Sequence, residues 1–409
     1  MIQLFYLLAA LQILFGLYLI YEGIRWIGYA RRRLLRHSGF YAPRVAVLCP
    51  CKGTEPGLEA NLTALCEFDY SNFNYEIFFI LASQDDAAYS VLRRLVERSR
   101  AKAHIVIAGL PEGCGEKVHN LRGAVQQLPE EFEALVFADS DGRPGRHWLQ
   151  KLVAPLGDDR VGAATTMRLF LPNRENFATA LLAAWNAPIV TLLGENRRNF
   201  CWGGGTAIRR SVFEQANVLE EWQNSVSDDY SLTRALEHIG RPIVFVPECL
   251  TVSLAATGFA ELMEFTNRQI VITRVYAPWL WYRAAATHGL YCLTLALGVY
   301  ATLETVLASR PAFQLLALTF LPVLLSVIRG ALRLSALTEV LPVWKSKLVQ
   351  TAWIWTVLNV FVPFLYVLNF VNSLFTRKIR WRGIQYELIS PNQTRILSPQ
   401  MIRRQPAAD

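Results

Sequence analysis

Acidic side chains at the ends of apolar runs are the residues of this chain best suited to chemistry. Asp139 and Asp141 lie two residues apart, after the apolar run 135–138 and before a glycine and a proline. An apolar run followed by turn-forming residues predicts a buried strand that ends in a loop. Two carboxylates there could hold a divalent cation, Mg²⁺ or Mn²⁺, and through it a diphosphate. Most Asp-x-Asp turns at a protein surface bind nothing, so the neighbouring signals decide the interpretation.

Two further acidic pairs belong to the same pattern. Asp85 and Asp86 follow the apolar run 76–81, and Asp228 and Asp229 precede a helical segment. An aspartate at a helix start is often only a cap, so the last pair alone indicates little. In open α/β sheets, however, ligands bind outside the carboxyl ends of the strands. We therefore expect the first two loops to open on one edge of a sheet.

Strands and helices alternate through the first third of the chain. Strands are predicted over 44–49, 76–81, 104–108 and 135–138, and helices over 58–68, 87–99 and 117–128. Alternation at this spacing predicts an α/β fold with a doubly wound, mainly parallel sheet. The glycine loop 201–206 is a second place where the backbone must approach another group closely, or a flexible turn.

The composition indicates membrane segments beside this domain. The chain has 409 residues, 53% of them hydrophobic, and a net charge of +8. Residues 1–27 are predicted to form a retained anchor, because the basic cluster 31–36 follows the apolar run instead of preceding it. The same cluster predicts that the next domain faces the cytoplasm. Anionic lipid accounts for the excess positive charge, so no nucleic-acid partner is expected.

The second half of the chain carries further apolar segments. Candidate spans cover 289–309, 312–328 and 351–375, and the basic cluster 377–382 follows the last one. Together with the anchor, three C-terminal spans would leave this cluster on the outer face. Since we expect it in the cytoplasm, either one segment is re-entrant or interfacial, or an extra segment crosses. The apolar segment 177–194 is predicted to be an interfacial or buried helix rather than a span.

These expectations divide the chain into five regions. They are an anchor (1–27), a cytoplasmic domain (28–257), an amphipathic interface region (258–280), C-terminal spans with a basic flank (281–388) and a polar tail (389–409). The seven cysteines contain no Cys-x-x-Cys motif, which argues against structural zinc or a disulfide framework and suits a reducing compartment.

Taken in order, the motifs resemble those of family 2 inverting glycosyltransferases with the GT-A fold, and most closely those of ceramide glucosyltransferases. The likeness rests on five motifs between about residues 43 and 275: Cys49–Pro56 with Asn61-Leu62, Gln84–Asp86, Lys117–Leu121, Asp139–Asp141 and Asp228–Tyr230. Five motifs in the family's order are far more specific than any one of them.

The resemblance implies a role for each group of residues. Asp229 would be the catalytic base, and Asp139 and Asp141 would bind the metal. The nucleotide-sugar site would comprise Lys52, Glu55, Asp85, Asp86, Lys117, Asp139, Arg268, Gln269 and Arg274. The acceptor loop would comprise Trp202, Gly203, Gly204 and Asp228. Asp85 and Asp86 would accept hydrogen bonds from uracil and ribose.

One motif departs from the family. The family usually has an Arg-Trp pair three residues after a Gln or Arg, and here Val271 and Ile272 follow Arg268 at that spacing. The second arginine is either absent or displaced to Arg274, which lies six residues from Arg268 and shares its helix face poorly. The motif therefore does not identify which side chain binds the diphosphate.

The resemblance implies transfer of glucose from UDP-glucose to the primary hydroxyl of ceramide, with inversion, at the membrane. The choice of glucose rests on the resemblance alone. Another lipid acceptor, such as diacylglycerol or a polyprenyl phosphate, would suit the same motifs. A polysaccharide synthase is less favoured because the Arg-Trp pair is missing, and a non-catalytic scaffold because all three acidic pairs are present. The sequence does not indicate an oligomeric state.

Overall fold

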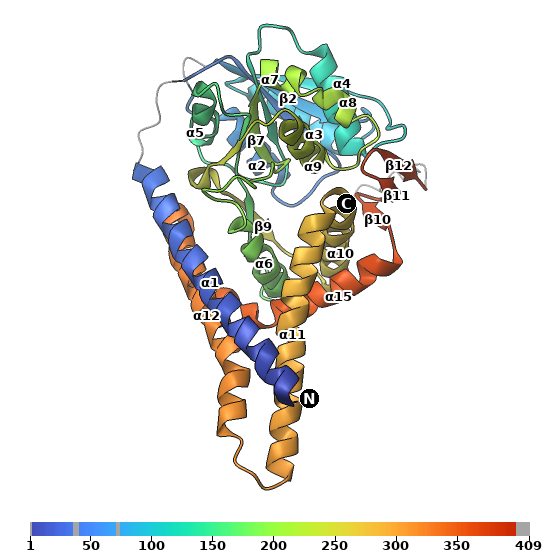
Figure 1. Cartoon of the computed structure of the whole chain (residues 1–409). Helices are drawn as coiled ribbons and strands as arrows, with labels where there is room; N and C mark the ends of the chain where they lie inside the picture. The colour runs from blue at the N-terminus through green and yellow to red at the C-terminus, as the bar shows by residue number, and fades with distance from the viewer. Residues whose placement is uncertain (1, 36–40, 71–73, 398–409) are drawn as a thin grey trace.

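Three long helices extend from one side of an α/β domain (Figure 1). The computed structural model describes residues 2–35, 41–70 and 74–397. The long helices are α1 (Ile2–Leu35), α11 (Pro278–Leu307) and α12 (Phe313–Val340).

The domain is built on a seven-stranded sheet with the order β3-β2-β1-β4-β7-β5-β8. Its strands are β1 (Val45–Pro50), β2 (Tyr75–Leu81), β3 (Lys102–Ile107), β4 (Ala134–Ala138), β5 (Ala163–Thr165), β7 (Gly205–Arg209) and β8 (Ile243–Phe245). Strand β7 runs antiparallel to both of its neighbours, and every other pairing in this sheet is parallel. The predicted mainly parallel, doubly wound sheet is confirmed.

Helices cover both faces of this sheet. One face packs on α2 (Leu58–Cys66), α3 (Ala88–Arg98) and α5 (Trp148–Val153), and the other on α4 (Glu116–Gln127), α7 (Arg210–Gln215), α8 (Val218–Glu221) and α9 (Asp228–His238). In β1, Val45 and Val47 face the first layer while Ala46 and Leu48 face the second. Strands covered on both faces are apolar throughout, which is why the parallel strands were visible in the sequence.

A separate group of elements connects the domain to the long helices. It contains a small parallel sheet of β6 (Arg168–Pro172) and β9 (Thr251–Ala255), with helices α6 (Phe177–Val190), α10 (Phe259–Tyr276) and α15 (Val362–Phe375). In Figure 1 helix α6 lies below the domain, and α10 and α15 lie beside α11. Helix α6 is buried, and its Trp185 stacks on Tyr366 of α15 with 4.9 Å between ring centroids. Of the two alternatives predicted for this segment, an interfacial or a buried helix, the structure shows the buried one.

The long helices α1, α11 and α12 are each long and apolar enough to cross a membrane. The span predicted over 351–375 is instead a bent pair, in which Ala352–Val360 and Val362–Phe375 meet at 59°. The short elements α13 (Lys345–Gln350) and α14 (Ala352–Trp355) precede the bend, and Pro363 lies at the start of α15. Helix α11 also begins earlier than the predicted residue 289, because it continues almost directly from α10.

The chain ends in a three-stranded antiparallel sheet that the sequence analysis did not predict. Strands β10 (Lys378–Trp381), β11 (Ile384–Ser390) and β12 (Gln393–Ile396) stand where a basic flank and a polar tail were expected. The tail prediction is wrong for residues 389–396, and residues 398–409 lie outside the described part. Alternating apolar residues around an Arg382-Gly383 turn are a hairpin signal that the charge of the segment obscured.

Candidate active site

A cavity of about 1590 Å³ lies between the α/β domain and the helices below it. Near the domain its wall includes Lys117, Asp139, Asp141, Asp228 and Asp229. At its other end it continues between the long helices, where it is lined by His288, Arg329 and Arg333. One cavity thus joins the predicted acidic motifs to the membrane-facing part of the molecule.

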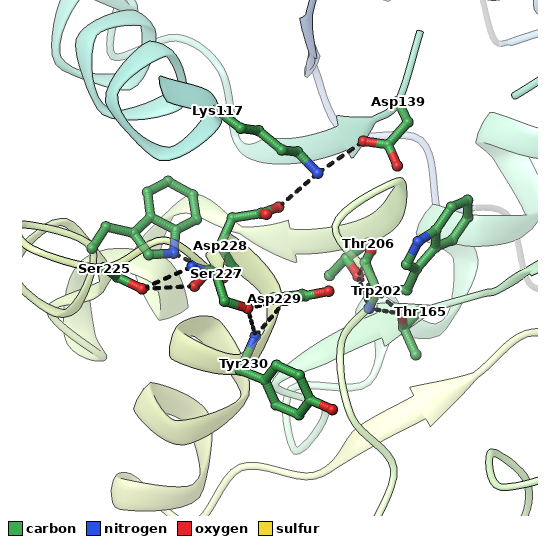
Figure 2. Close-up of polar contacts among 11 residues, drawn as sticks. Lys117, Asp139, Thr165, Trp202, Thr206, Ser225, Ser227, Asp228, Asp229 and Tyr230 are labelled. Atoms are coloured by element: carbon green, nitrogen blue, oxygen red, sulfur yellow. Dashed lines mark hydrogen bonds and ion pairs between the residues drawn. The ribbon is translucent and has the colours of Figure 1, made fainter. Parts of the chain in front are cut away.

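Lys117 holds two of the acidic motifs together. Its Nζ lies 2.8 Å from Asp139 Oδ1 and 3.1 Å from Asp228 Oδ2 (Figure 2). Asp139 follows β4, Asp228 begins α9, and Lys117 is in the first turn of α4. The three side chains therefore come from segments far apart in the sequence, and their opposite charges fix the separation of the two loops.

Burial and charge act against each other in this cluster. Burial would raise the pKa of Asp139, but the charges of Lys117 and Arg168 outweigh it and hold the pKa below its usual value. Burial raises the pKa of Asp228 to about 6, against the charge of Lys117 and with the added repulsion of Asp229. Burial alone would lower the pKa of Lys117, but the two carboxylates raise it. Lys117 therefore stays charged at neutral pH.

Asp141 has an oxygen available for a metal ion. Arg168 Nη1 donates a hydrogen bond to Asp141 Oδ2, whereas Asp141 Oδ1 is buried and has no hydrogen-bond partner. No three His, Cys, Asp or Glu side chains gather as a metal site within the described ranges. Mg²⁺-type sites commonly use one or two carboxylates and complete their coordination with substrate phosphates. Asp139 and Asp141 fit such a shared site, since each offers one carboxylate.

Asp229 lies at the N-terminus of α9 and keeps one oxygen free. Its Oδ1 accepts hydrogen bonds from the Ser227 hydroxyl and from the backbone N–H of Tyr230, the latter at 2.8 Å. Its Oδ2 has no partner among the described residues and Asp229 lines the cavity. Ser227 is the N-cap of the helix, and a helix N-terminus favours a negatively charged side chain. Asp229 is therefore held by two hydrogen bonds to Oδ1, and Oδ2 is left without a partner.

The glycine loop passes too close to this cluster for any side chain. A Cβ on Gly203 would lie 2.1 Å from Asp228 Oδ2, and one on Gly204 would lie 2.4 Å from Asp139 Oδ2. The loop is anchored by the backbone N–H of Trp202, which donates to Thr165 Oγ1 at 2.9 Å. Trp202 and Gly203 line the cavity, and Gly204 does not. The glycines are thus explained by close packing on the carboxylates.

The two loops after β1 and β2 divide into residues inside and outside the cavity. Lys52 and Glu55 line it, and Lys52 Nζ lies 2.8 Å from Glu116 Oε2. Asp85 and Asp86 do not line it. Asp86 Oδ1 accepts hydrogen bonds from the backbone N–H groups of Gly53 and Ala88, so this aspartate fixes the neighbouring loop. The direct uracil and ribose contacts expected of Asp85 and Asp86 have no geometric support here.

Only some of the nucleotide-sugar-binding residues predicted on helix α10 line the cavity. Arg268 and Gln269 line it, and burial lowers the pKa of Arg268 to about 10. The Nε of Arg268 is buried without a hydrogen-bond partner. Arg274 instead donates to the backbone carbonyl of Ser373 on α15 and does not line the cavity. The placement of Arg274 at the site is therefore wrong, because six residues along a helix turn the side chain to another face.

Several cationic residues of the cavity were not predicted from the sequence. Arg168 begins the apolar strand β6, and a single charge at the start of such a strand was its only signal. Arg329 and Arg333 interrupt an apolar helix, which is the usual mark of a functional residue inside a membrane. Arg380 and Arg382 belong to the basic cluster 377–382, whose composition predicts a membrane interface, and the structure places both in the cavity wall.

The profile of glycosyl transferase family 21 matches residues 4–394, almost the whole chain. The chain belongs to this family. The resemblance to inverting glycosyltransferases and ceramide glucosyltransferases is confirmed at the family level, and this glycosyl transferase carries three helices that are long and apolar enough to cross a membrane.

The individual proteins that this family 21 chain resembles share low sequence identity with it. Ceramide glucosyltransferase 1 of Caenorhabditis elegans is 24% identical over 207 residues, which are 48% of this chain and 43% of that protein. The match therefore spans less than half of the relative's length. The mannosyltransferase PcManGT of Pyrobaculum calidifontis, solved with GDP-Man and Mn²⁺, is 17% identical with a TM-score of 0.48, covering 90% of this chain and 99% of that one. GalNAc-T7, solved with UDP, GalNAc and Mn²⁺, is 12% identical with a TM-score of 0.39, covering 54% and 45%.

Proposed function

We propose that the protein transfers glucose from UDP-glucose to the primary hydroxyl of ceramide at the cytoplasmic face of a membrane. The product is β-glucosylceramide, because the anomeric configuration inverts. One observation carries the proposal: Asp139, Asp141 and Asp229 line a single cavity that continues between the long apolar helices. A glycosyl transfer enzyme with this arrangement is suited to an acceptor that enters from the bilayer.

The donor diphosphate is assigned to the end of the cavity near the domain. When glucose leaves, negative charge develops on the diphosphate, and nearby cations stabilise the transition state. A divalent metal held by Asp139 and Asp141 would supply Lewis-acid stabilisation of that leaving group. Lys117 keeps Asp139 ionised and in place, and Arg268 offers a buried guanidinium nitrogen without a partner.

Asp229 is the proposed general base. Its free Oδ2 would accept the proton of the acceptor hydroxyl while that oxygen attacks the anomeric carbon from the face opposite the diphosphate. The hydrogen bonds from Ser227 and Tyr230 to Oδ1 orient the carboxylate. A single displacement of this kind inverts the sugar configuration and needs no covalent enzyme intermediate.

Ceramide is the acceptor favoured by the relative from Caenorhabditis elegans, which is named as a ceramide glucosyltransferase. A specific observation favours a second candidate. Arg333 is 5% exposed, and the Nε atoms of Arg329 and Arg333 are buried without hydrogen-bond partners at the membrane end of the cavity. Guanidinium groups bind phosphates strongly. A polyprenyl phosphate acceptor would give these two arginines a counter-charge.

The experiment is transfer by the full-length protein in lipid vesicles. Labelled UDP-glucose, UDP-galactose or GDP-mannose is supplied with ceramide, diacylglycerol or polyprenyl phosphate, with and without a chelator. We expect labelled glucosylceramide from UDP-glucose and ceramide, its loss with chelator, and its return when Mn²⁺ is added in excess. Product from polyprenyl phosphate alone would establish the second candidate, and transfer to no lipid from any donor would overturn both.

A further inference from the structure

The C-terminal sheet lies beside the α/β domain and next to α10 (Figure 1). Arg380, Trp381 and Arg382 form part of the cavity wall together with Asp139 and Asp141. The guanidinium of Arg382 donates to Glu55 Oε1 and, at 3.4 Å, to the backbone carbonyl of Lys52. The last strands of the chain thus reach the loop that follows its first strand.

Two sets of contacts hold the sheet in this position. Ile379, Ile384 and Leu388 pack in a buried cluster with Val271 and Ile272 of α10. Tyr386 belongs to the same cluster, and its hydroxyl accepts a hydrogen bond from the backbone N–H of Glu116 at 3.3 Å, one residue before Lys117. Val271 and Ile272, which stand at the spacing of the family's Arg-Trp pair, therefore form part of the surface on which the sheet packs.

The turn that carries Arg382 is conformationally unfavourable for arginine. Trp381 pairs with Ile384, so Arg382 and Gly383 form a two-residue hairpin loop, with φ angles of 49° and 83°. A two-residue loop with both φ angles positive favours Asn-Gly at these positions. A non-glycine residue held at positive φ beside a cavity suggests that the side chain is kept for function.

Arg382 has a partner that it can release. The side chains of Arg382 and Glu55 are 33% and 45% exposed, and exposed ion pairs of this kind are weak. Arg268 extends the same cationic edge, since its guanidinium lies 5.3 Å from the Trp381 ring centroid and donates to the carbonyl of Arg380 at 3.4 Å. A doubly charged diphosphate offers stronger, charge-assisted hydrogen bonds than one exposed carboxylate.

We propose that Arg382 exchanges Glu55 for the diphosphate of the donor, so that the C-terminal sheet supplies a guanidinium which α10 lacks at residues 271–272. The proposal rests on the proposed function in requiring a nucleoside diphosphate sugar as donor. It assigns a substrate-binding role to the sheet, and it gives a reason for an arginine at the hairpin turn.

The test is the variant Arg382→Asn in the full-length protein. Because asparagine is favoured at this turn, the hairpin should be at least as stable, while the cation is lost. Dissociation constants for UDP, GDP and uridine are measured by calorimetry with Mn²⁺, and the melting temperature is measured alongside. We expect about a tenfold weaker affinity for the diphosphate that the parent binds, since one charge-assisted hydrogen bond is lost. Uridine affinity and melting temperature should not fall.

Arg395→Asn is the matched control, because Arg395 lies on β12 of the same sheet, pairs with Glu387 and does not line the cavity. It should bind UDP as the parent does, and Arg382→Lys should recover part of the lost affinity. If the parent binds UDP or GDP and Arg382→Asn binds it equally well, the role of Arg382 is overturned while the donor stands. If the parent binds neither diphosphate, the proposed function fails together with this inference.

Discussion

At the scale of single residues, Asp229 offers the clearest test of chemistry without loss of structure. In Asp229→Asn the side-chain oxygen can still accept hydrogen bonds from Ser227 and Tyr230. The amide cannot take up a proton, so we expect transfer to fall by about a hundredfold or more, as when a general base is removed. The measurement is the initial rate with saturating donor and acceptor. Glu237→Gln, on the exposed side of the same helix, should keep the parental rate, and an unchanged rate in Asp229→Asn would remove the base assignment.

Gly203 gives a second prediction at this scale. In Gly203→Ala the new Cβ would meet Asp228 Oδ2 at 2.1 Å and Lys117 Nζ at 2.7 Å. The Lys117 bridge must then shift, and overpacking of this kind costs about 1–3 kcal/mol. We expect a lower melting temperature and a loss of transfer of at least about tenfold, which corresponds to 1.4 kcal/mol. In Gly145→Ala the Cβ has no atom within 4 Å and should change neither quantity. Equal behaviour of the two variants would show that the close packing has no consequence.

The residues of the site were only partly predictable from sequence. Asp139 and Asp141 could be placed because a carboxylate directly after a buried strand must lie at the edge of the sheet. Spacing along a loop does not say which way a side chain turns, and so Asp86 was expected at the nucleotide but binds the backbone of Gly53. Arg168 could not be paired with Asp141 in advance, since their contact depends on a small second sheet that the sequence did not reveal.

At the scale of elements, strands β2 and β3 carry a charged cluster. Its contribution to stability can be tested by varying the pH. Glu76 on β2 accepts hydrogen bonds from Arg44 and Lys102 and contacts the ring of His104. Burial would raise the pKa of Glu76, but these cationic partners lower it. Since the folded-state pKa is depressed, the stabilisation is present above the ordinary glutamate pKa and is lost as the pH falls through the folded-state value.

Glu76→Gln should therefore destabilise the domain by about 2 kcal/mol at pH 7, because three partners lose a charged acceptor. The difference in melting temperature between parent and variant should narrow as the pH is lowered below about 4.5, near the ordinary glutamate pKa. Thermal unfolding at several pH values measures both effects. Glu97→Gln removes an exposed carboxylate 3.7 Å from Arg93 and should have little effect at any pH. If the difference in melting temperature between parent and Glu76→Gln stays constant with pH, the stabilisation by Glu76 is not electrostatic.

Regular elements were predictable where one periodicity dominated. The strands β1, β2 and β4 are buried on both faces, so their unbroken apolar runs identified them. The C-terminal sheet was missed because its alternation of apolar and basic residues also suits a membrane interface. The bend before α15 was missed for a related reason, since composition over 351–375 measures hydrophobicity and does not report the direction of the chain.

At the scale of the whole molecule, helix α1 and the C-terminal sheet both contact the domain. Near the end of α1, Trp26 Nε1 donates to the carbonyl of Leu193 at 2.8 Å, and Arg33 Nη2 lies 2.8 Å from Glu248 Oε1. The C-terminal sheet contacts the domain through Arg382 and Glu55. The contact between Arg382 and Glu55 requires the domain and the C-terminal sheet to lie on the same side of the membrane.

This requirement predicts the number of crossings. If α1, α11 and α12 each cross once, the chain after α12 returns to the side of the domain, and the bent pair 352–375 must turn back without crossing. Three crossings and one re-entrant pair therefore remove the conflict between four predicted spans and a basic C-terminal flank. The 59° bend and the Arg382–Glu55 contact point to the same arrangement.

Labelling of single introduced cysteines in sealed vesicles measures this arrangement. Glu97→Cys and Arg395→Cys should react with a membrane-impermeant maleimide from one side, and Arg310→Cys, in the loop between α11 and α12, from the other. The replaced side chains are exposed, and six of the seven native cysteines are buried, so Cys292→Ser provides the background. If residue 395 reacts from the same side as residue 310, the bent pair crosses the membrane. The sheet could then not contact Glu55, and its proposed place beside the diphosphate would be impossible.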